Sequence, residues 1–363
     1  MLKISVFGDI CPMTLGNPFN IELSDSDFVL GNLECALTDA PKPIKKAGPV
    51  LHASESFAKV LKDTGFYAMN LANNHIRDCG DKGVITTISS CAKHGILTFG
   101  AGDILESASA PLIMECDGVK VGIIAFAERE FNYVKDGKSG AAFFDPYESF
   151  ELISDLKNKV NAVIVLYHGG IEHYIYPSPL LQKKCRKMID FGANVVLCQH
   201  SHCIGTRENY KGCEILYGQG NSVFGYRKDD DSWNYGLLAH IQISASNVNV
   251  WYDVLETMCD GTVHIADEDV QREVLESFEM ESSKILDENF LSDQWKHFCT
   301  CKEPLYMAML LGFGKNTNRL NRLLRNFLVK MFYNKRQLNV IHNLIRCDAH
   351  EEVIETILEK YDF

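Results

Sequence analysis

The amino-acid sequence predicts an α/β fold that is followed by an all-helical C-terminal region. Through about residue 265, short apolar segments with many β-branched side chains alternate with stretches of helical periodicity, which is typical of an α/β protein. After Ile265 the apolar residues recur at helical spacing, and Asp267, Ser292 and Asp348 are suitable N-caps. We therefore expect two domains, residues 1–265 and residues 266–363.

The predicted strands of the first hundred residues run into polar side chains where each strand ends. Asp9 follows the predicted strand 4–7, and Glu34 follows the predicted strand 25–30. Asn74 and His75 follow the predicted strand 66–71. Gly8 lets the chain turn there and directs the Asp9 carboxylate off the sheet edge. Helices are expected over 54–65 and 84–94, and a surface loop over 40–49.

The same arrangement continues through the next strands. Residues 120–126, 161–167 and 194–198 are predicted strands, and they are followed by Glu128-Arg129-Glu130, by His168, and by His200 and His202. Further strands are expected over 96–99, 213–216 and 236–254, and helices over 150–160 and 178–191. Because α/β sheets usually present their chemistry at strand ends, this edge is the expected site.

Composition excludes several classes of protein. The net charge is −12, which argues against a general nucleic-acid binder. No apolar run approaches the roughly 18 residues that span a bilayer, and the chain enters a strand directly, so we expect neither a transmembrane segment nor a signal peptide. The 13 scattered cysteines indicate a reducing compartment, and we expect a cytoplasmic protein.

Five strand ends together predict a metal site. The candidate side chains are Asp9, Glu34, Asn74 with His75, His168, and His200 with His202. A bridging carboxylate can hold two ions about 3.5–4 Å apart, and donors from separate strands can surround both. His200 and His202 point the same way if their backbone is extended, and carboxylate, amide and imidazole donors suit Mn, Fe or Zn. Any one of these histidines alone is more often structural.

These residues resemble the ordered motifs of the CapA family of poly-γ-glutamate capsule synthesis proteins, which belongs with the calcineurin-like metallophosphoesterases. The matching motifs are Gly8-Asp9, Asn32-Leu33-Glu34, Ala72-Asn73-Asn74-His75, His168-Gly169-Gly170-Ile171-Glu172, Gln199-His200-Ser201-His202 and the segment 217–224. The resemblance covers about residues 1–255 and implies a four-layer α/β/β/α sandwich around two divalent metal ions.

The resemblance also implies roles for the candidate residues. One ion would be held by Asp9, Glu34 and His202, and the other by Glu34, Asn74, His168 and His200, with Glu34 bridging them and His75 as the general acid. Two positions depart from the wider superfamily pattern. Cys11 stands where the first motif of that superfamily has a His, so a water or the Cys11 thiol would complete the coordination of the first ion. The segment Gln199-His200-Ser201-His202 replaces the superfamily motif Gly-His-His-Pro-His.

Five polar side chains near these motifs are candidate substrate contacts, namely Glu128, Arg129, Glu172, Asn221 and Arg227. Arg129 can clamp an anion bidentately, and the alternative is a solvated loop charge. Glu172, together with His173, can instead orient an imidazole.

We expect a metal-dependent hydrolase that acts on a phosphoester or on an anionic polymer such as poly-γ-glutamate, in capsule or surface-polymer synthesis. The alternative is a non-catalytic accessory protein of capsule assembly that uses the fold as an anion-binding platform.

The segment 315–336 carries seven basic residues, no acids and an apolar stripe at helical spacing. It can contact a membrane surface or a partner. The alternative, which we favour from the sequence, is that the stripe packs inside the helical region while the arginines face water.

Overall fold

The computed structural model describes residues 1–12, 16–23, 25–135, 137–245 and 247–359, and it divides the chain into two compact units, Met1–Leu291 and Ser292–Phe363. Helix α7 (Glu268–Lys284) packs against strands of the first unit, β13 (Arg207–Tyr210) and β17 (Val248–Thr257). The predicted domain boundary at residue 265 stays a prediction.

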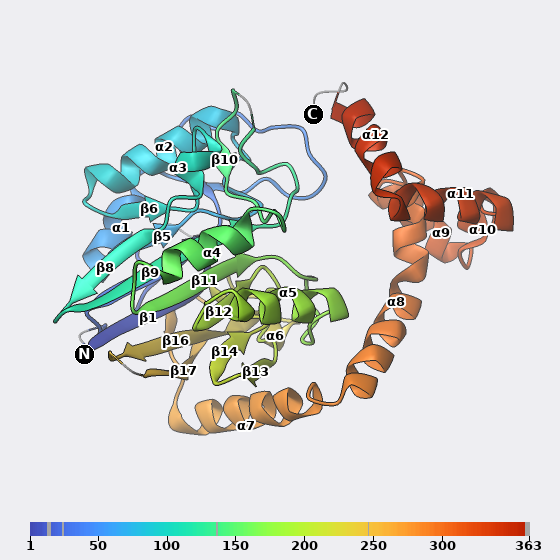
Figure 1. The fold of residues 1–363 in the computed structure, drawn as a ribbon. Helices are drawn as coiled ribbons and strands as arrows, with labels where there is room; N and C mark the ends of the chain where they lie inside the picture. The colour runs from blue at the N-terminus through green and yellow to red at the C-terminus, as the bar shows by residue number, and fades with distance from the viewer. Residues whose placement is uncertain (13–15, 24, 136, 246, 360–363) are drawn as a thin grey trace. The chain divides into compact units, whose positions relative to one another are not determined.

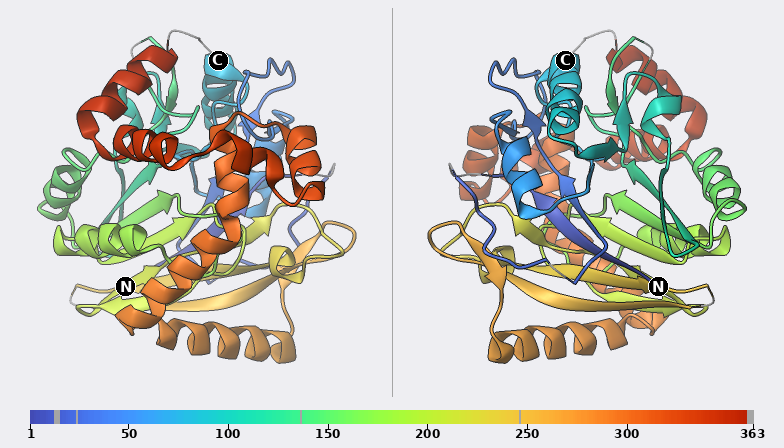
Figure 2. Two further views of the ribbon diagram at one scale, coloured as in Figure 1. Left: turned by 90° about the vertical axis from the view of Figure 1, so that its right-hand side faces the viewer. Right: turned by 90° about the vertical axis from the view of Figure 1, so that its left-hand side faces the viewer.

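Two β-sheets form the centre of the first unit (Figures 1 and 2). The strands of the larger sheet are β1 (Leu2–Ile10), β2 (Phe28–Leu33), β5 (Ala68–Asn70), β6 (Leu97–Phe99), β15 (Asn221–Val223), β16 (Tyr235–Ile243), β17 and β18 (Val263–Ile265). The strands of the smaller sheet are β8 (Leu112–Cys116), β9 (Val119–Ala127), β11 (Ala162–His168), β12 (Val195–Gln199), β13 and β14 (Cys213–Leu216). Short pairs join β3 (Ala36–Leu37) with β4 (His52–Ala53), and β7 (Ala101–Gly102) with β10 (Gly140–Ala141).

Alternating side chains of the smaller sheet define the layers. In β11, Ile164 and Leu166 belong to the hydrophobic core that also contains β1 and β2, whereas Val165 and Tyr167 belong to a second core. Successive side chains of a strand point to opposite faces, so one face packs on the larger sheet. The other face packs on α4 (Ser149–Lys157) and α5 (Pro179–Asp190).

The outer face of the larger sheet is covered by α1 (Phe57–Thr64) and α2 (Gly80–Lys93), whose buried Phe57, Leu61 and Val84 join the first core. The predicted α/β/β/α order of layers is therefore confirmed. Short helices α3 (Leu105–Ala108) and α6 (Asp231–Asn234) lie in connecting segments.

Strand register places the polar side chains in rows. In the parallel pairs β1–β2 and β2–β5, Asp9 lies opposite Asn32 and Asn32 opposite Asn70. In the smaller sheet His168 lies opposite Gln199. Because parallel strands end at the same edge of a sheet, side chains that are far apart in sequence meet there.

The second unit is helical. Its helices are α8 (Glu288–Leu310, which begins in the first unit), α9 (Lys315–Leu323), α10 (Phe327–Phe332), α11 (Lys335–Arg346) and α12 (Asp348–Glu359). No helix within the described ranges is long and apolar enough to cross a membrane.

Candidate metal centre

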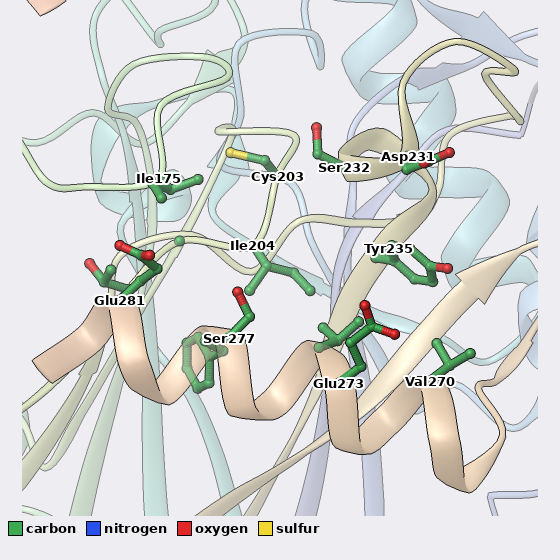
Figure 3. A pocket seen from close by; sticks show the side chains of 14 residues that line it. Ile175, Cys203, Ile204, Asp231, Ser232, Tyr235, Val270, Glu273, Ser277 and Glu281 are labelled. Carbon is green, nitrogen blue, oxygen red and sulfur yellow. The ribbon is translucent and has the colours of Figure 1, made fainter.

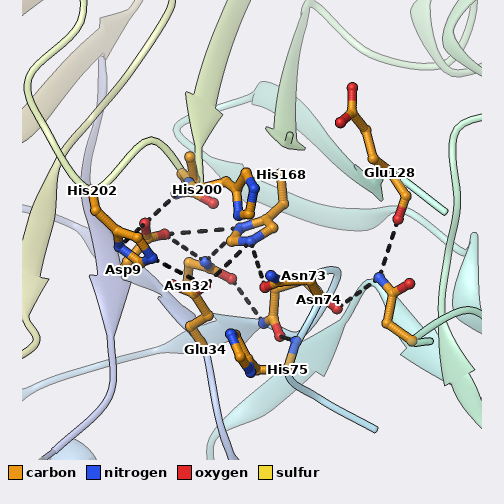
Figure 4. A network of polar contacts seen from close by, with 12 residues as sticks. Asp9, Asn32, Glu34, Asn73, Asn74, His75, Glu128, His168, His200 and His202 are labelled. Atoms are coloured by element: carbon orange, nitrogen blue, oxygen red, sulfur yellow. Dashed lines mark hydrogen bonds and ion pairs between the residues drawn. The ribbon is translucent and has the colours of Figure 1, made fainter. Parts of the chain in front are cut away.

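The predicted ligands converge on one buried cluster at the edge where the two sheets meet (Figure 4). The donor atoms of Glu34, His168 and His200 all lie within 4.8 Å of one another, and so do those of Asp9, Glu34 and His202. Glu34 belongs to both groups. Asn74 adds its amide oxygen, which lies 3.0 Å from Nε2 of His168.

Several donor atoms of this cluster are buried without a hydrogen-bond partner. Among the described residues neither carboxylate oxygen of Glu34 is hydrogen-bonded, and Nδ1 of His200 has no partner either. Glu34 is fully buried, and its Oε1 lies 3.4 Å from Nε2 of His168. A buried carboxylate without hydrogen bonds is costly unless it binds a cation. This donor set therefore fits divalent metal ions.

The electrostatics of the cluster favour the same conclusion. Burial, reinforced by the neighbouring Asp9 carboxylate, raises the pKa of Glu34 well above its usual range. Burial also lowers the pKa of His168 and lowers the pKa of His200 well below the usual value. A bound cation would favour the ionised carboxylate and the neutral imidazoles, which are the forms that bind metal.

A frame of amides holds these ligands. Asn32 donates from Nδ2 to Oδ1 of Asp9 at 2.8 Å, and the same atom lies 3.1 Å from Nδ1 of His168. Asn70 links the sheets by donating to Asn32 at 3.2 Å and to Gln199 at 3.3 Å. This second layer orients the ligands.

The backbone at His200 and His202 differs from the extended conformation on which the sequence argument rested. Their φ angles are 97° and 53°, in the left-handed region. The side-chain alternation of an extended strand therefore does not apply here, and the assumption of an extended backbone at His200 and His202 was wrong. His200 nevertheless belongs to one of the two candidate ligand groups and His202 to the other. The backbone N–H of His200 donates to Oδ2 of Asp9 at 3.0 Å, and this hydrogen bond holds the turn. Such backbone strain is common at functional sites.

His75 lies beside Glu34 in Figure 4 and forms a buried dyad with Asp78, with 2.6 Å between Nδ1 and Oδ2. Lys46 forms a close ion pair with Oδ1 of Asp78, and its ammonium lies 3.2 Å from Nδ1 of His75. The Lys46 side chain is only 2% exposed, although it lies in the segment 40–49 that was expected to be a surface loop. Desolvation lowers the pKa of His75, although Asp78 opposes that shift.

Asn73 supports the turn before His75. Its side-chain oxygen accepts from the backbone N–H of His75 at 3.1 Å, and its Nδ2 donates to the carbonyl of Leu33 at 2.8 Å.

Two of the residues predicted to contact substrate, Glu128 and Arg129, interact with other side chains of the protein. The Glu128 carboxylate accepts from the hydroxyl of Tyr167 at 2.8 Å and from Lys184 at 3.3 Å, and Figure 4 shows it directed away from the cluster. Arg129 lies 3.6 Å from Asp145 and stacks over Phe143.

The other three predicted contacts lie nearer the cluster. Asn221 is 2.9 Å from Nδ1 of His202 and donates to the backbone carbonyl of Trp233, so it holds an imidazole in place. The Arg227 guanidinium stacks on Trp233, whose ring lies 4.9 Å from that of His202. Glu172 is exposed and close enough to act on the pKa of Glu34. Their roles as substrate contacts stay predictions.

The Cys11 thiol does not join the cluster. Cys11 is buried, and contact with it raises the pKa of the Cys35 thiol well above its usual value. Neither described group of candidate metal ligands contains Cys11.

Sequence reasoning missed Lys46, Asp78, Asn32 and Trp233 as parts of the site. Asn32 and Asp78 belong to segments with recognisable motifs, so their polar side chains were available signals. Nothing local marks Lys46 or Trp233, because their burial depends on chain segments that are distant in sequence.

A groove of about 440 Å³ lies between α7 and the loop 203–206, directly after His202 in the chain (Figure 3). Apolar side chains such as Ile204 and Val274 line it together with the acids Asp231 and Glu273. No candidate metal ligand lines this groove, and its acids repel anions, so it is separate from the candidate centre.

Comparison with known proteins gives the family. Residues 15–226 match the family described as bacterial capsule synthesis protein PGA_cap. The PGA biosynthesis protein CapA of Bacillus subtilis (strain 168) is 32% identical over 214 residues, which are 57% of this chain and 56% of that protein. The capsule biosynthesis protein CapA of Bacillus anthracis is 32% identical over 221 residues, 58% of this chain and 54% of that protein. The match spans little more than half the length of these relatives.

A probable polyglutamine synthesis accessory protein of Mycobacterium tuberculosis is 27% identical over 220 residues, 57% of this chain and 58% of that protein. Among solved structures, a hypothetical protein from Thermus thermophilus has a TM-score of 0.43 at 15% identity and covers 69% of this chain and 99% of its own. The 5'-nucleotidase of Candida albicans has a TM-score of 0.36 at 10% identity, over 63% of this chain and 45% of its own.

Proposed function

This chain belongs to the PGA_cap family of bacterial capsule synthesis proteins, and from that premise we propose that it is a metal-dependent hydrolase of a phosphoester or of an anionic polymer such as poly-γ-glutamate. The observation that supports this proposal is the buried cluster around Glu34, whose carboxylate oxygens have no hydrogen-bond partner among the described residues. A cluster with a purely structural role would leave fewer polar atoms unpaired.

The proposed ligands divide into two sets that share Glu34. Asp9, Glu34 and His202 would hold one divalent ion, and Glu34, Asn74, His168 and His200 would hold the other. When bound, such ions act as Lewis acids on the substrate, activate a water and offset developing negative charge.

His75 is the proposed proton donor to the leaving group. Its Nδ1 is engaged by Asp78, so Nε2 is the atom from which a proton can leave. Burial lowers the pKa of His75, and an imidazolium with a lowered pKa gives up its proton more readily. Lys46 balances the charge of Asp78 and holds the dyad in place.

The test is hydrolysis by the purified chain with Mn²⁺ added. A chromogenic phosphoester and a γ-glutamyl polymer are the two substrates, and metal content is measured in each preparation. His75→Ala should reduce turnover by about 10²–10⁴-fold with the metal retained, whereas His52→Ala, at an exposed histidine, should leave turnover unchanged. Full activity of His75→Ala excludes this mechanism.

A second candidate is a non-catalytic accessory protein of capsule or surface-polymer assembly. The observation that favours it is that the mycobacterial relatives are named as accessory proteins. This candidate predicts polymer binding without turnover, and metal analysis after reconstitution separates the two. About two equivalents of metal with turnover support the enzyme, and bound polymer without metal supports the platform.

A further inference from the structure

Several of the apolar side chains that the second unit exposes to solvent belong to α9 and α10. Helices α9 and α10 are joined by Leu324–Asn326, and Arg325 and Asn326 adopt left-handed φ angles of 53° and 61°. Asn321 stabilises this turn from inside, where it donates to Asn326 and accepts from the N–H of Val329. Among the described side chains of these two helices, the buried ones are Asn321 and Val329, both small.

The apolar stripe faces outward instead. Leu323 is 76% exposed, Phe327 is 59% exposed and Met331 is 65% exposed. The expectation that this stripe packs inside the helical region was therefore wrong for these side chains. Helices α9 and α10 are short and meet through the polar side chain of Asn321. Phe332 packs on Phe313, whereas Leu323, Phe327 and Met331 stay largely exposed.

Four cations belong to the same two helices and the turn between them. Arg319, Arg322, Arg325 and Lys330 are all exposed, and within the described part of the chain none of them is paired with an acid. The segment 315–336 carries a charge of +7 while the whole chain carries −12, so the remainder, by subtraction, carries −19. The positive charge is thus concentrated in a segment that also exposes apolar side chains.

We propose that the turn around Leu323–Phe327 inserts its apolar side chains into the interface of an anionic phospholipid membrane, while its arginines and Lys330 bind the headgroups. Exposed Leu, Phe and Met beside Lys and Arg are the composition of an interfacial membrane anchor. Each cation near an anionic bilayer surface contributes about 1 kcal/mol, and the apolar side chains add a term that salt does not screen.

Other occupants fit this surface less well. A second copy that docked symmetrically would bring two faces of +7 together, and like charges repel. Nucleic acid would satisfy the cations, but it offers no apolar phase for Leu323 or Met331. The proposal does not depend on the metal centre, so its outcome is independent of the proposed hydrolase.

Flotation of the full chain with lipid vesicles tests the proposal. Vesicles of phosphatidylcholine alone are compared with vesicles that contain about one-third phosphatidylglycerol. Binding is expected only to the anionic vesicles and should weaken as salt rises. Arg322→Gln with Lys330→Gln should weaken binding by about 25-fold, at about fivefold for each cation lost.

The apolar contribution is tested with Leu323→Ser and Phe327→Ser, which should weaken binding at high salt as well as at low salt. The matched control is Leu180→Ser with Lys183→Gln, which changes one exposed apolar and one exposed basic side chain of α5. Circular dichroism verifies that each variant keeps its helices. Equal flotation with neutral and anionic vesicles, or unchanged flotation of both sets of variants, overturns the proposal. A dimer in light scattering that Phe327→Ser abolishes also overturns it and assigns the surface to a second copy.

Discussion

Removing the Lys46 ammonium tests the reasoning about the proton-donor dyad most directly. In Lys46→Met the aliphatic stem keeps its place, but the Asp78 carboxylate loses its buried counter-charge. Both side chains are almost fully buried, at 2% and 1% exposure. Breaking a buried ion pair by removing one partner costs about 3–5 kcal/mol. Asp78 keeps hydrogen bonds from the N–H of Leu51 and from His75, so we expect the lower end of that range.

The assay is urea denaturation of the full chain, followed by circular dichroism. Lys45→Met is the matched control, because Lys45 is the exposed neighbour in the same loop and should shift the free energy of unfolding by at most about 0.5 kcal/mol. Adding Asp78→Asn to Lys46→Met should restore part of the lost stability, since it removes the uncompensated charge. If Lys46→Met and Lys45→Met unfold at the same urea concentration, the ammonium is not a buried partner of Asp78 and the reasoning is refuted.

Two further predictions concern the metal centre and its scaffold. Because burial and Asp9 raise the pKa of Glu34, Glu34 retains its proton to higher pH in the metal-free protein, and metal must displace that proton. Mn²⁺ affinity should therefore rise with pH, and calorimetry in two buffers of different ionisation enthalpy should show proton release; no proton release would contradict this. Gly100→Ala should destabilise the protein by more than about 1 kcal/mol, since φ is 85° and a Cβ would lie 2.6 Å from Oδ1 of Asn70. Gly212→Ala, also at positive φ but with open space around the added Cβ, should cost less when both variants are compared by thermal melting, and equal costs would show that the Asn70 contact is unimportant.

The sequence alone determined which side chains are available for chemistry and at which strand ends they occur. Asp9, Glu34, Asn74 and His168 each follow an apolar segment that can only be buried, so the α/β class and the candidate ligands were readable from local pattern. The helical character of the C-terminal region was readable for the same reason, since helical periodicity is a local property.

Tertiary structure decided what those side chains meet. Parallel register brings Asp9, Asn32 and Asn70 into one row, and the packing of two sheets brings His168 and His200 to Glu34. The burial of Lys46, the contact of Asn221 with His202 and the outward-facing stripe at Leu323 all depend on segments that are remote in sequence or on how neighbouring helices pack. Periodicity predicts whether a side chain lies in an apolar or a polar environment, but only the packed fold determines which residues it contacts.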